Sequence, residues 1–282
     1  MIAQEIIEKL KLTLMIRKIF KISIFIFTRR FIFLIKNFFY KNKNYKKDQE
    51  VKNYSHLIKK NGFLIIENFL DKKNCESIIN AMDSFYSKNK EMVWNDQYNS
   101  EYRMFGAEKI SEKINNFYLN NLLINIGSFC LSKSLSNLMT MANRVKYSQN
   151  NLGSGGGWHR DDFNFQFKAI LYLNDVSIKN GPFQLIKHSN KFFKIIEDSL
   201  TAKLDGSSTR IDNEKVALFD KNRLETITGN AGTLILVDTS LIHRGKPLED
   251  GKRYALTNYY YPYDKVDSMK NHFLPKINIE KL

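Results

Sequence analysis

The chain is poor in the residues that build thiol metal clusters and disulfide frameworks. It has 2 cysteines in 282 residues, Cys75 and Cys130, and they stand in unrelated contexts. No CxxC pair and no Cys/His cluster occurs, which excludes zinc-ribbon and dithiol redox motifs. Two isolated thiols in a chain of this length are typical of a reducing compartment, so we predict a cytoplasmic location.

Long uncharged apolar runs are also missing. The longest one within the hydrophobic stretch 15–40 is Ile22 to Thr28, far short of the ~20 residues that a membrane-spanning helix needs. The stretch is also a poor secretory signal, because Glu5 and Glu8 precede it and no small-residue cleavage site follows it. The sequence therefore predicts neither a spanning helix nor a cleaved leader.

Acidic residues are the third deficit. The chain has 29 Asp and Glu against 44 Lys and Arg, a formal net charge of +15. Residues 1–50 hold 12 Lys and Arg against 4 Asp and Glu, so +8 of that charge lies at one end. Such an excess indicates an appendage that meets an anionic partner, either a membrane surface or a nucleic acid.

The stretch 15–40 has the pattern of an interfacial helix. At ~100° per residue its basic side chains share one broad arc, with Arg30 outside it, and Ile and Phe fill the rest. The basic residues on that arc are Arg17, Lys18, Lys21, Arg29 and Lys36. This pattern is typical of a helix that lies in an anionic membrane surface, and a basic apolar helix is not the Lys/Arg-plus-aromatic groove of nucleic-acid binders. A helix that packs its apolar face on the main domain is the alternative, and both remain open.

We divide the chain into a basic apolar segment at 1–50, ending in a solvated linker at 41–50, and a domain at 51–282. Within the domain, the pattern predicts a helix at 72–88 capped by Asp71, a mostly helical stretch at 109–141, an irregular stretch at 91–107 and a polar insertion or lid at 192–220. Strands are expected at 62–70, 143–149, 168–173, 183–186, 232–238 and 254–261. Many short strands separated by turns predict a sandwich or jelly-roll barrel.

The candidate metal ligands begin with His159-Arg160-Asp161. Side chains two residues apart on a strand point to the same face, so His159 and Asp161 converge, whereas Asp162 does not. His243, just after the apolar strand 232–238, is the candidate third ligand. Two histidines and one carboxylate on one side of a metal leave positions open, which is the pattern of non-heme Fe(II) oxygenases.

An oxygenase of this type needs an organic reductant, and 2-oxoglutarate chelates iron at one end and presents a carboxylate at the other. Arg253, at the start of the last predicted strand, is the candidate partner of that carboxylate, because a guanidinium binds it bidentately. Arg244 and Lys252 are the competitors. Arg244 adjoins His243 and should point to the opposite face, and Lys252 offers only a point charge.

With these residues in place, the chain resembles the phytanoyl-CoA dioxygenase family of Fe(II)/2-oxoglutarate oxygenases over about residues 54–262. The matching segments are GFLIIENFL at 62–70, WHRD at 158–161, LYLNDV at 171–176, NGPFQLI at 180–186, AGTL at 231–234, and HRG at 243–245 followed by Arg253.

The resemblance implies a mainly β fold with flanking helices, a double-stranded β-helix of the jelly-roll or cupin-like kind. It implies that His159, Asp161 and His243 hold Fe(II), that Arg253 binds 2-oxoglutarate and that O2 is consumed. It also implies a polar contact to 2-oxoglutarate from the strand before the metal motif, for which Lys146 and Tyr147 are the candidates. A halogenase is disfavoured, because Asp161 retains the carboxylate that halogenases lack.

The expected activity is hydroxylation of a C–H bond in a small molecule, a lipid or a glycan precursor. Where the family usually has Pro-Gly-Ser-His near the substrate, this chain has Ile-Lys-His-Ser-Asn at 186–190, so no relative's substrate is carried over. The alternative is a membrane-peripheral binding protein with a non-catalytic barrel. The presence of the three ligands together with Arg253 argues against it.

Overall fold

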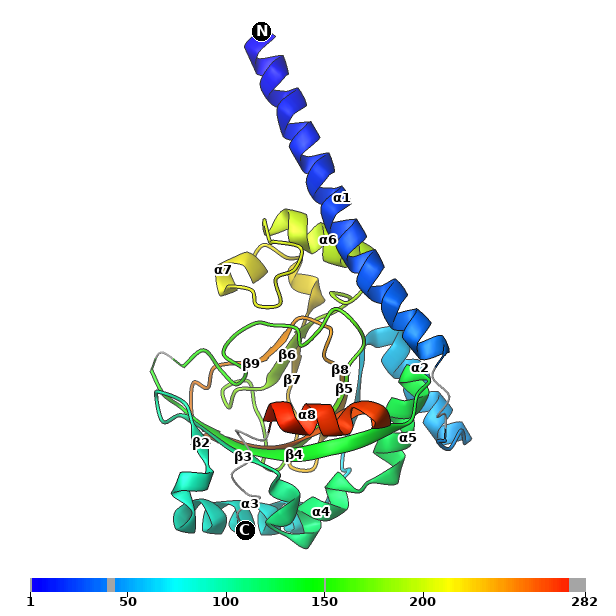
Figure 1. Ribbon diagram of the computed structural model, residues 1–282. Coiled ribbons are helices and arrows are strands. Elements are labelled where there is room, and N and C mark those ends of the chain that lie inside the picture. The colour runs from blue at the N-terminus through cyan, green and yellow to red at the C-terminus, as the bar shows by residue number, and fades with distance from the viewer. Residues whose placement is uncertain (1, 40–43, 150, 274–282) are drawn as a thin grey trace.

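The structure, a computed structural model, describes residues 2–39, 44–149 and 151–273. Residues 40–43, which end the basic apolar stretch and begin the predicted linker, lie outside the described residues. Two antiparallel sheets form the centre of the molecule (Figure 1). The larger has the order β1 (Phe63–Ile66), β8 (Leu234–Asp238), β5 (Phe167–Tyr172), β10 (Lys252–Pro262), β4 (Leu135–Lys146), β3 (Glu101–Phe105) and β2 (Trp94–Asn95). The smaller has the order β7 (Leu224–Ile227), β6 (Phe183–Ile186) and β9 (His243–Gly245).

The strands of the larger sheet separate a core face from a cavity face. Along β5, Phe167, Ala169 and Leu171 join the main hydrophobic core, whereas Lys168 and Tyr172 on the other face line a cavity. This is the period-2 alternation of a strand that is covered on both faces. A second core, which includes Tyr172, lies between the two sheets. The prediction of a mainly β, jelly-roll-like fold with flanking helices is confirmed.

Helices cover the core face of the larger sheet. They are α2 (Gln49–Asn61), α3 (Lys72–Lys88), α4 (Glu112–Tyr118) and α5 (Asn121–Leu131), with the short turns η1 (Lys90–Met92) and η2 (Ala107–Lys109) between them. In Figure 1, α3 and α4 lie beneath the sheet. The predicted cap of α3 is confirmed, because the Asp71 carboxylate accepts the backbone N–H of Asn74 at 2.8 Å. The helix packs on the core through its apolar face, on which Cys75, Ile78 and Met82 are buried.

The insertion after β6 packs on the smaller sheet. It contains α6 (Phe192–Thr201), α7 (Asn213–Val216) and η3 (Lys221–Arg223), and its Leu204 and Ile211 join a core with Trp158 and Ile242. After β10 the chain continues as η4 (Tyr263–Lys265) and α8 (Val266–Phe273). The insertion was predicted to be polar and low in periodicity, whereas the structure has ordered helices within it, and α6 buries Ile195 on its apolar face.

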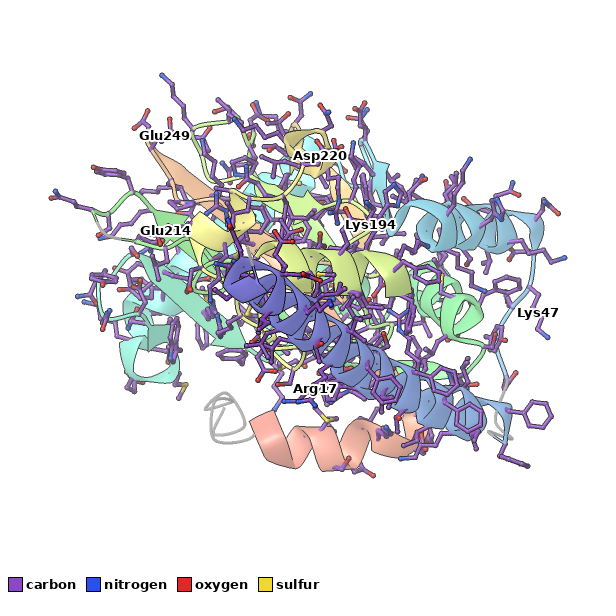
Figure 2. The ribbon with its side chains drawn as sticks, turned by 90° about the horizontal axis from the view of Figure 1, so that it is seen from above. Arg17, Lys47, Lys194, Glu214, Asp220 and Glu249 are labelled. Atoms are coloured by element: carbon purple, nitrogen blue, oxygen red, sulfur yellow. The ribbon has the colours of Figure 1, made fainter. Side chains whose placement is uncertain are left out.

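The N-terminal segment forms one long helix, α1 (Ile2–Phe38), which extends well beyond the domain (Figure 1). Figure 2 shows it passing over α6. The contact is apolar, with Ile22 and Ile26 packed against Phe163 and Ile195. Within the described ranges, no helix is both long and apolar enough to cross a membrane.

Four predicted segments differ from the structure, the strand at 62–70 among them. The stretch 109–141 is helical only to residue 131, and β4 begins at Leu135; this strand is buried on both faces, so its sequence lacks the alternation that would reveal it. The stretch 91–107 contains β2 and β3. The predicted linker 41–50 ends in the first turn of α2, whose cap is Asp48.

The predicted strand 62–70 ends at Ile66, because the chain then turns onto Gly232. The backbone N–H of Phe69 donates to the Gly232 carbonyl at 3.0 Å. Gly232 has a φ of 90°, and a Cβ there would overlap the carbonyl oxygen of Leu70. This approach therefore requires glycine.

Candidate active site

Backbone pairing brings the two predicted histidine ligands together. The N–H of His159 donates to the carbonyl of His243 at 2.9 Å, and the N–H of His243 returns a bond at 2.7 Å, which adds residue 159 to the edge strand β9. The ring centroids lie 4.4 Å apart. Nδ1 of His159 faces the Gly157 carbonyl at 2.9 Å, and Nδ1 of His243 faces the Leu241 carbonyl at 2.8 Å. Because a carbonyl only accepts, each Nδ1 carries the proton and each Nε2 is left as a ligand atom.

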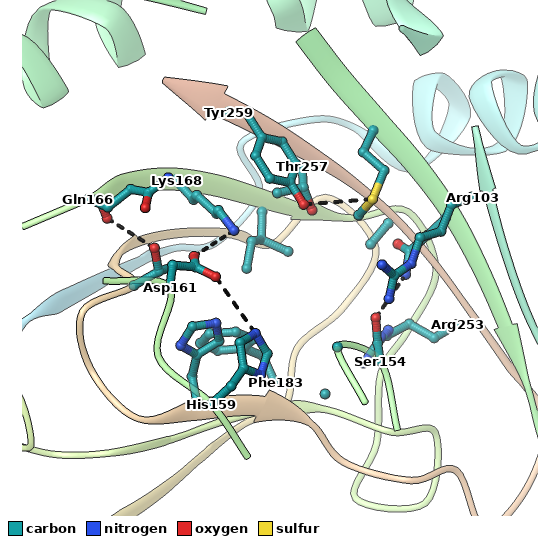
Figure 3. A pocket seen from close by; sticks show the side chains of 18 of the residues that line it. Arg103, Ser154, His159, Asp161, Gln166, Lys168, Phe183, Arg253, Thr257 and Tyr259 are labelled. Carbon is teal, nitrogen blue, oxygen red and sulfur yellow. Dashed lines mark hydrogen bonds and ion pairs between the residues drawn. The ribbon is translucent and has the colours of Figure 1, made fainter. Parts of the chain in front are cut away.

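Asp161 turns its carboxylate to the same point, as strand parity predicted. Its N–H donates to the Thr239 carbonyl at 3.0 Å, and its Oδ1 lies 3.7 Å from Nε2 of His159 (Figure 3). One ligand atom from each of His159, Asp161 and His243 lies within 4.8 Å of the others. This donor set, two imidazoles and one carboxylate, fits an Fe(II) ion with open positions.

The electrostatics of the site hold all three side chains in the protonation state that metals bind. Burial lowers the pKa of His243 to about 3 and also lowers the pKa of His159, so both rings are neutral. Burial alone would raise the pKa of Asp161, but the neighbouring charge of Lys168 and the hydrogen bonds to the carboxylate hold it well below its usual range. Neutral imidazole and ionised carboxylate are the forms that coordinate a metal.

Lys168 is the main site residue that the sequence analysis missed. Its Nζ lies 2.6 Å from Oδ2 of Asp161 and 4.3 Å from the centroid of the Tyr259 ring (Figure 3). Burial would lower the pKa of this lysine, but the charge of Asp161 raises it well above its usual range. In the structure, Lys168 shares one face of β5 with Tyr172. That this face lies beside Asp161 depends on the pairing of β5 with β8 and could not be read from the sequence.

Arg253, the candidate partner of the 2-oxoglutarate carboxylate, lies at the other end of the same cavity (Figure 3). Only 4% of the residue is exposed, and its guanidinium donates to the Gly181 carbonyl. Its Nε has no hydrogen-bond partner among the described residues. It packs against Gly245, where an added Cβ would meet both Nη atoms at 3.0 Å. A buried cation with an unsatisfied donor fits the distal carboxylate of a 2-oxo diacid.

A polar network borders Arg253. The buried Glu101 carboxylate accepts from Arg103 at 2.8 Å, from Ser154 at 2.5 Å and from Asn143 at 3.3 Å. Burial alone would raise the pKa of Glu101, but the Arg103 charge and these bonds lower it overall. Arg103, Asn143 and Ser154 line the cavity and were not predicted. Arg103 was missed because β3 lies in a stretch predicted to be irregular.

The structure does not bring Lys146 or Tyr147 to the cavity. Lys146 lies at the end of β4 with its Nζ 5.8 Å from the centroid of the Tyr102 ring, and Tyr147 is 55% exposed. The polar side chain that β4 does present to the cavity is Asn143. Arg244 points away from the site, as expected, and donates to Gln184 at 2.9 Å.

Asp161 and Arg253 thus border one cavity of about 490 Å³, enclosed between the two sheets and open at one side. A cavity of this size holds a small molecule beside a co-substrate. The fold and this site define a metal-dependent enzyme of the double-stranded β-helix class.

The chain belongs to the phytanoyl-CoA dioxygenase family, whose sequence pattern matches residues 58–253. It is therefore a non-heme Fe(II)/2-oxoglutarate-dependent oxygenase, and the predicted family is confirmed. No curated protein matches the chain by sequence.

Solved structures with the same fold come from this class of enzyme. EctD from S. alaskensis with bound Fe is 15% identical, with a TM-score of 0.57, over 78% of this chain and 80% of that one. The α-ketoglutarate-dependent epimerase SnoN from nogalamycin biosynthesis is 12% identical, with a TM-score of 0.53, over 76% and 83%. HygX from Streptomyces hygroscopicus with nickel, 2-oxoglutarate and hygromycin B bound is 16% identical, with a TM-score of 0.51, over 77% and 88%.

Proposed function

We propose that the protein hydroxylates a C–H bond of a small molecule, a lipid or a glycan precursor, using Fe(II), 2-oxoglutarate and O2. One observation carries the proposal: His159, Asp161 and His243 converge at one end of a cavity that has the buried Arg253 at its other end. We assign the three ligands to Fe(II) and Arg253 to 2-oxoglutarate. When bound, the iron supplies O2 activation, with 2-oxoglutarate as the two-electron reductant that leaves as succinate and CO2.

The chain's own residues supply orientation. The carbonyls of Gly157 and Leu241 fix the two imidazole tautomers, and Lys168 occupies the carboxylate oxygen of Asp161 that does not face His159. The carboxylate is therefore arranged to coordinate through one oxygen. Such fixed ligands keep the remaining positions on the metal open for the 2-oxo acid and O2.

The test is anaerobic binding followed by turnover. Protein with Fe(II) and 2-oxoglutarate should develop the visible absorption band of an iron–2-oxo acid chelate. Arg253→Met should weaken 2-oxoglutarate binding at least about tenfold while iron binding changes little, since one bidentate ion pair is lost. Lys252→Met, at the exposed neighbouring position, is the matched control. Absence of the band in folded protein, or equal losses in both variants, would overturn the assignment.

We also propose that α1 binds an anionic membrane surface. Its exposed side carries a stripe of large apolar residues at helical spacing, each between 49% and 66% exposed: Ile16, Phe20, Ile24, Phe27, Phe31 and Leu34. Arg17 and Lys21 lie beside this stripe at ~100° per residue. Unpartnered apolar surface next to basic residues supports an interfacial role, and like-charged helices argue against a second copy as the partner.

Co-sedimentation of the full chain with vesicles tests this second proposal. Binding is expected to vesicles that contain phosphatidylserine and to fall on neutral vesicles. The variant Phe20→Ser/Phe27→Ser/Phe31→Ser should lose most of the binding, while Phe193→Ser, at an even more exposed phenylalanine on α6, should keep it. Equal sedimentation of wild type, the triple variant and Phe193→Ser would refute the proposal. So would self-association of the chain that buries the apolar stripe of α1.

A further inference from the structure

The charges around the active-site cavity do not balance. Four cationic side chains line it against a single carboxylate, and the acid Glu101 lies directly behind the wall. The cations are Arg103, Lys168, Arg210 and Arg253, and the carboxylate is Asp161. The charges of Glu101 and Arg103 cancel each other, since the two form an ion pair at 2.8 Å. The three cations Lys168, Arg210 and Arg253 then remain against the single carboxylate.

Loading the site does not remove this excess. A divalent metal ion and doubly charged 2-oxoglutarate cancel each other, so the loaded cavity keeps two positive charges. With Arg253 assigned to the co-substrate and Asp161 to the metal, the unassigned cations are Lys168 and Arg210. Lys168 is buried and Arg210 is exposed, and two uncompensated positive charges that line one cavity favour an anion.

Arg210 is built into the mouth of the cavity by the insertion after β6. Residues 209–211 run beside 158–160, with Arg160 N–H donating to Thr209 at 2.8 Å and Ile211 N–H donating to Trp158 at 3.0 Å. The guanidinium donates to the carbonyls of Gly155 at 2.9 Å and Gly156 at 3.3 Å. No carboxylate in the described part of the chain pairs with it. The strand-like pairing holds this cation next to His159, while its preferred partner, an oxyanion, is missing.

Lys168 lies deeper in the same cavity. Its partner Asp161 shares its charge with the metal once it coordinates one, so the ammonium is then only partly neutralised and also attracts a substrate anion. Lys168, Arg210 and His159 line the same cavity. Gln166, Thr239 and Tyr261 line this region as neutral hydrogen-bonding groups.

We infer that the substrate is a polar molecule carrying a phosphate or carboxylate group, which Arg210 receives at the mouth and Lys168 draws toward the metal. This inference rests on the proposed function and narrows its substrate class. Hydroxyl groups of the substrate find partners in the neutral side chains, which matches a sugar-like anion better than an unsubstituted hydrocarbon.

The test uses the full chain loaded with Ni(II) and 2-oxoglutarate, with inorganic phosphate and acetate as binding probes in calorimetry. At least one probe should bind, and Arg210→Gln should weaken that binding about tenfold, with partial rescue by Arg210→Lys. Arg17→Gln, on the exposed side of α1, should leave it unchanged. In parallel, 2-oxoglutarate consumption with Fe(II) and O2 is compared between sugars and their phosphorylated or carboxylated counterparts. The class of sugar, phosphorylated or carboxylated, that increases 2-oxoglutarate consumption identifies the anionic group of the substrate.

The outcomes separate the two claims. Normal 2-oxoglutarate binding with no binding of either probe, equal affinities in Arg210→Gln and wild type, or equal stimulation by neutral and anionic sugars, would overturn the anionic-substrate inference alone. Failure of 2-oxoglutarate to bind metal-loaded, folded protein would overturn the proposed function and the inference with it.

Discussion

Replacing Lys168 with methionine should destabilise the metal-free protein and raise its affinity for a divalent ion. In the structure the ammonium is the charge partner of Asp161, with Nζ 2.6 Å from Oδ2. A metal ion would bind the same carboxylate. Lysine and metal therefore share one anion, and removing the lysine leaves the whole of that charge to the metal. Methionine keeps most of the volume of the lysine stem, so packing changes little.

The magnitude follows from the geometry. At 2.6 Å the attraction between unit charges is roughly 6 kcal/mol for an effective dielectric constant near 20, before desolvation is subtracted. Losing one partner of a fully buried pair costs about 3–5 kcal/mol. The Asp161 side chain is 19% exposed and borders a cavity, so a cost of about 2–3 kcal/mol is expected. In the metal-bound protein the ion also neutralises this carboxylate, so the loss of the ammonium costs less there. A difference of about 1.4 kcal/mol between the two costs corresponds to roughly tenfold tighter metal binding.

The assay combines denaturant unfolding of the metal-free protein with Ni(II) titration in calorimetry. Lys194→Met is the control, since its pair with Glu197 at 2.7 Å is exposed and should contribute less than about 1 kcal/mol. Weaker metal binding in Lys168→Met than in wild type would refute the reasoning, because it would mean that Lys168 supports the metal site rather than competes for it.

Three further outcomes are expected from equilibrium unfolding. Because the folded-state pKa of Glu101 lies below its unfolded value, its contribution is present above about pH 4.3 and is lost as pH falls; Glu101→Gln should therefore flatten the decline in stability between pH 5 and 3. Gly232→Ala should destabilise by more than about 2 kcal/mol, whereas Gly157→Ala, with a similar φ of 91° but open space, should cost only about 1 kcal/mol. Arg223→Met should cost about 3–5 kcal/mol, because it leaves the Asp198 carboxylate, now bonded at 2.6 and 2.9 Å, buried without a partner.

Local sequence patterns were sufficient to predict those helices and strands that bury only one face. The helix at 72–88 shows its apolar face and its Asp71 cap, and the structure reproduces both. The first part of strand β4 was not predicted, because its residues are buried on both faces and only a short connection separates it from the preceding helix. Periodicity reports which side of an element faces water, so it fails where neither side does.

The candidate site divides in the same way. The candidate site residues could be proposed from the sequence, because their residue types and spacing are typical of an Fe(II)/2-oxoglutarate site and strand parity predicts which side chains converge. They are His159, Asp161, His243 and Arg253. A single lysine such as Lys168 indicates no particular function by its residue type. It becomes a site residue only because β5 pairs with β8 and β10, which brings its face beside Asp161. Sequence reasoning therefore predicted the proposed metal ligands and Arg253, which the structure brings to one cavity, and did not predict the side chains that surround them.

The two interpretations of α1 left open by the sequence do not exclude each other. A helix of this length has room for more than one apolar face: Ile22 and Ile26 are buried against Phe163, while the stripe through Phe27 remains exposed. The packed face also contacts the segment that carries the proposed metal ligand Asp161, because Arg29 donates to both oxygens of Asp162 at 3.2 and 3.1 Å. Asp162 follows Asp161 and points to the opposite side, as parity requires. If binding to a membrane surface shifted α1, the contact between Arg29 and Asp162 would transmit that shift to the loop beside the proposed metal site. The basic apolar segment is thus in direct contact with the candidate active site, which its sequence alone does not indicate.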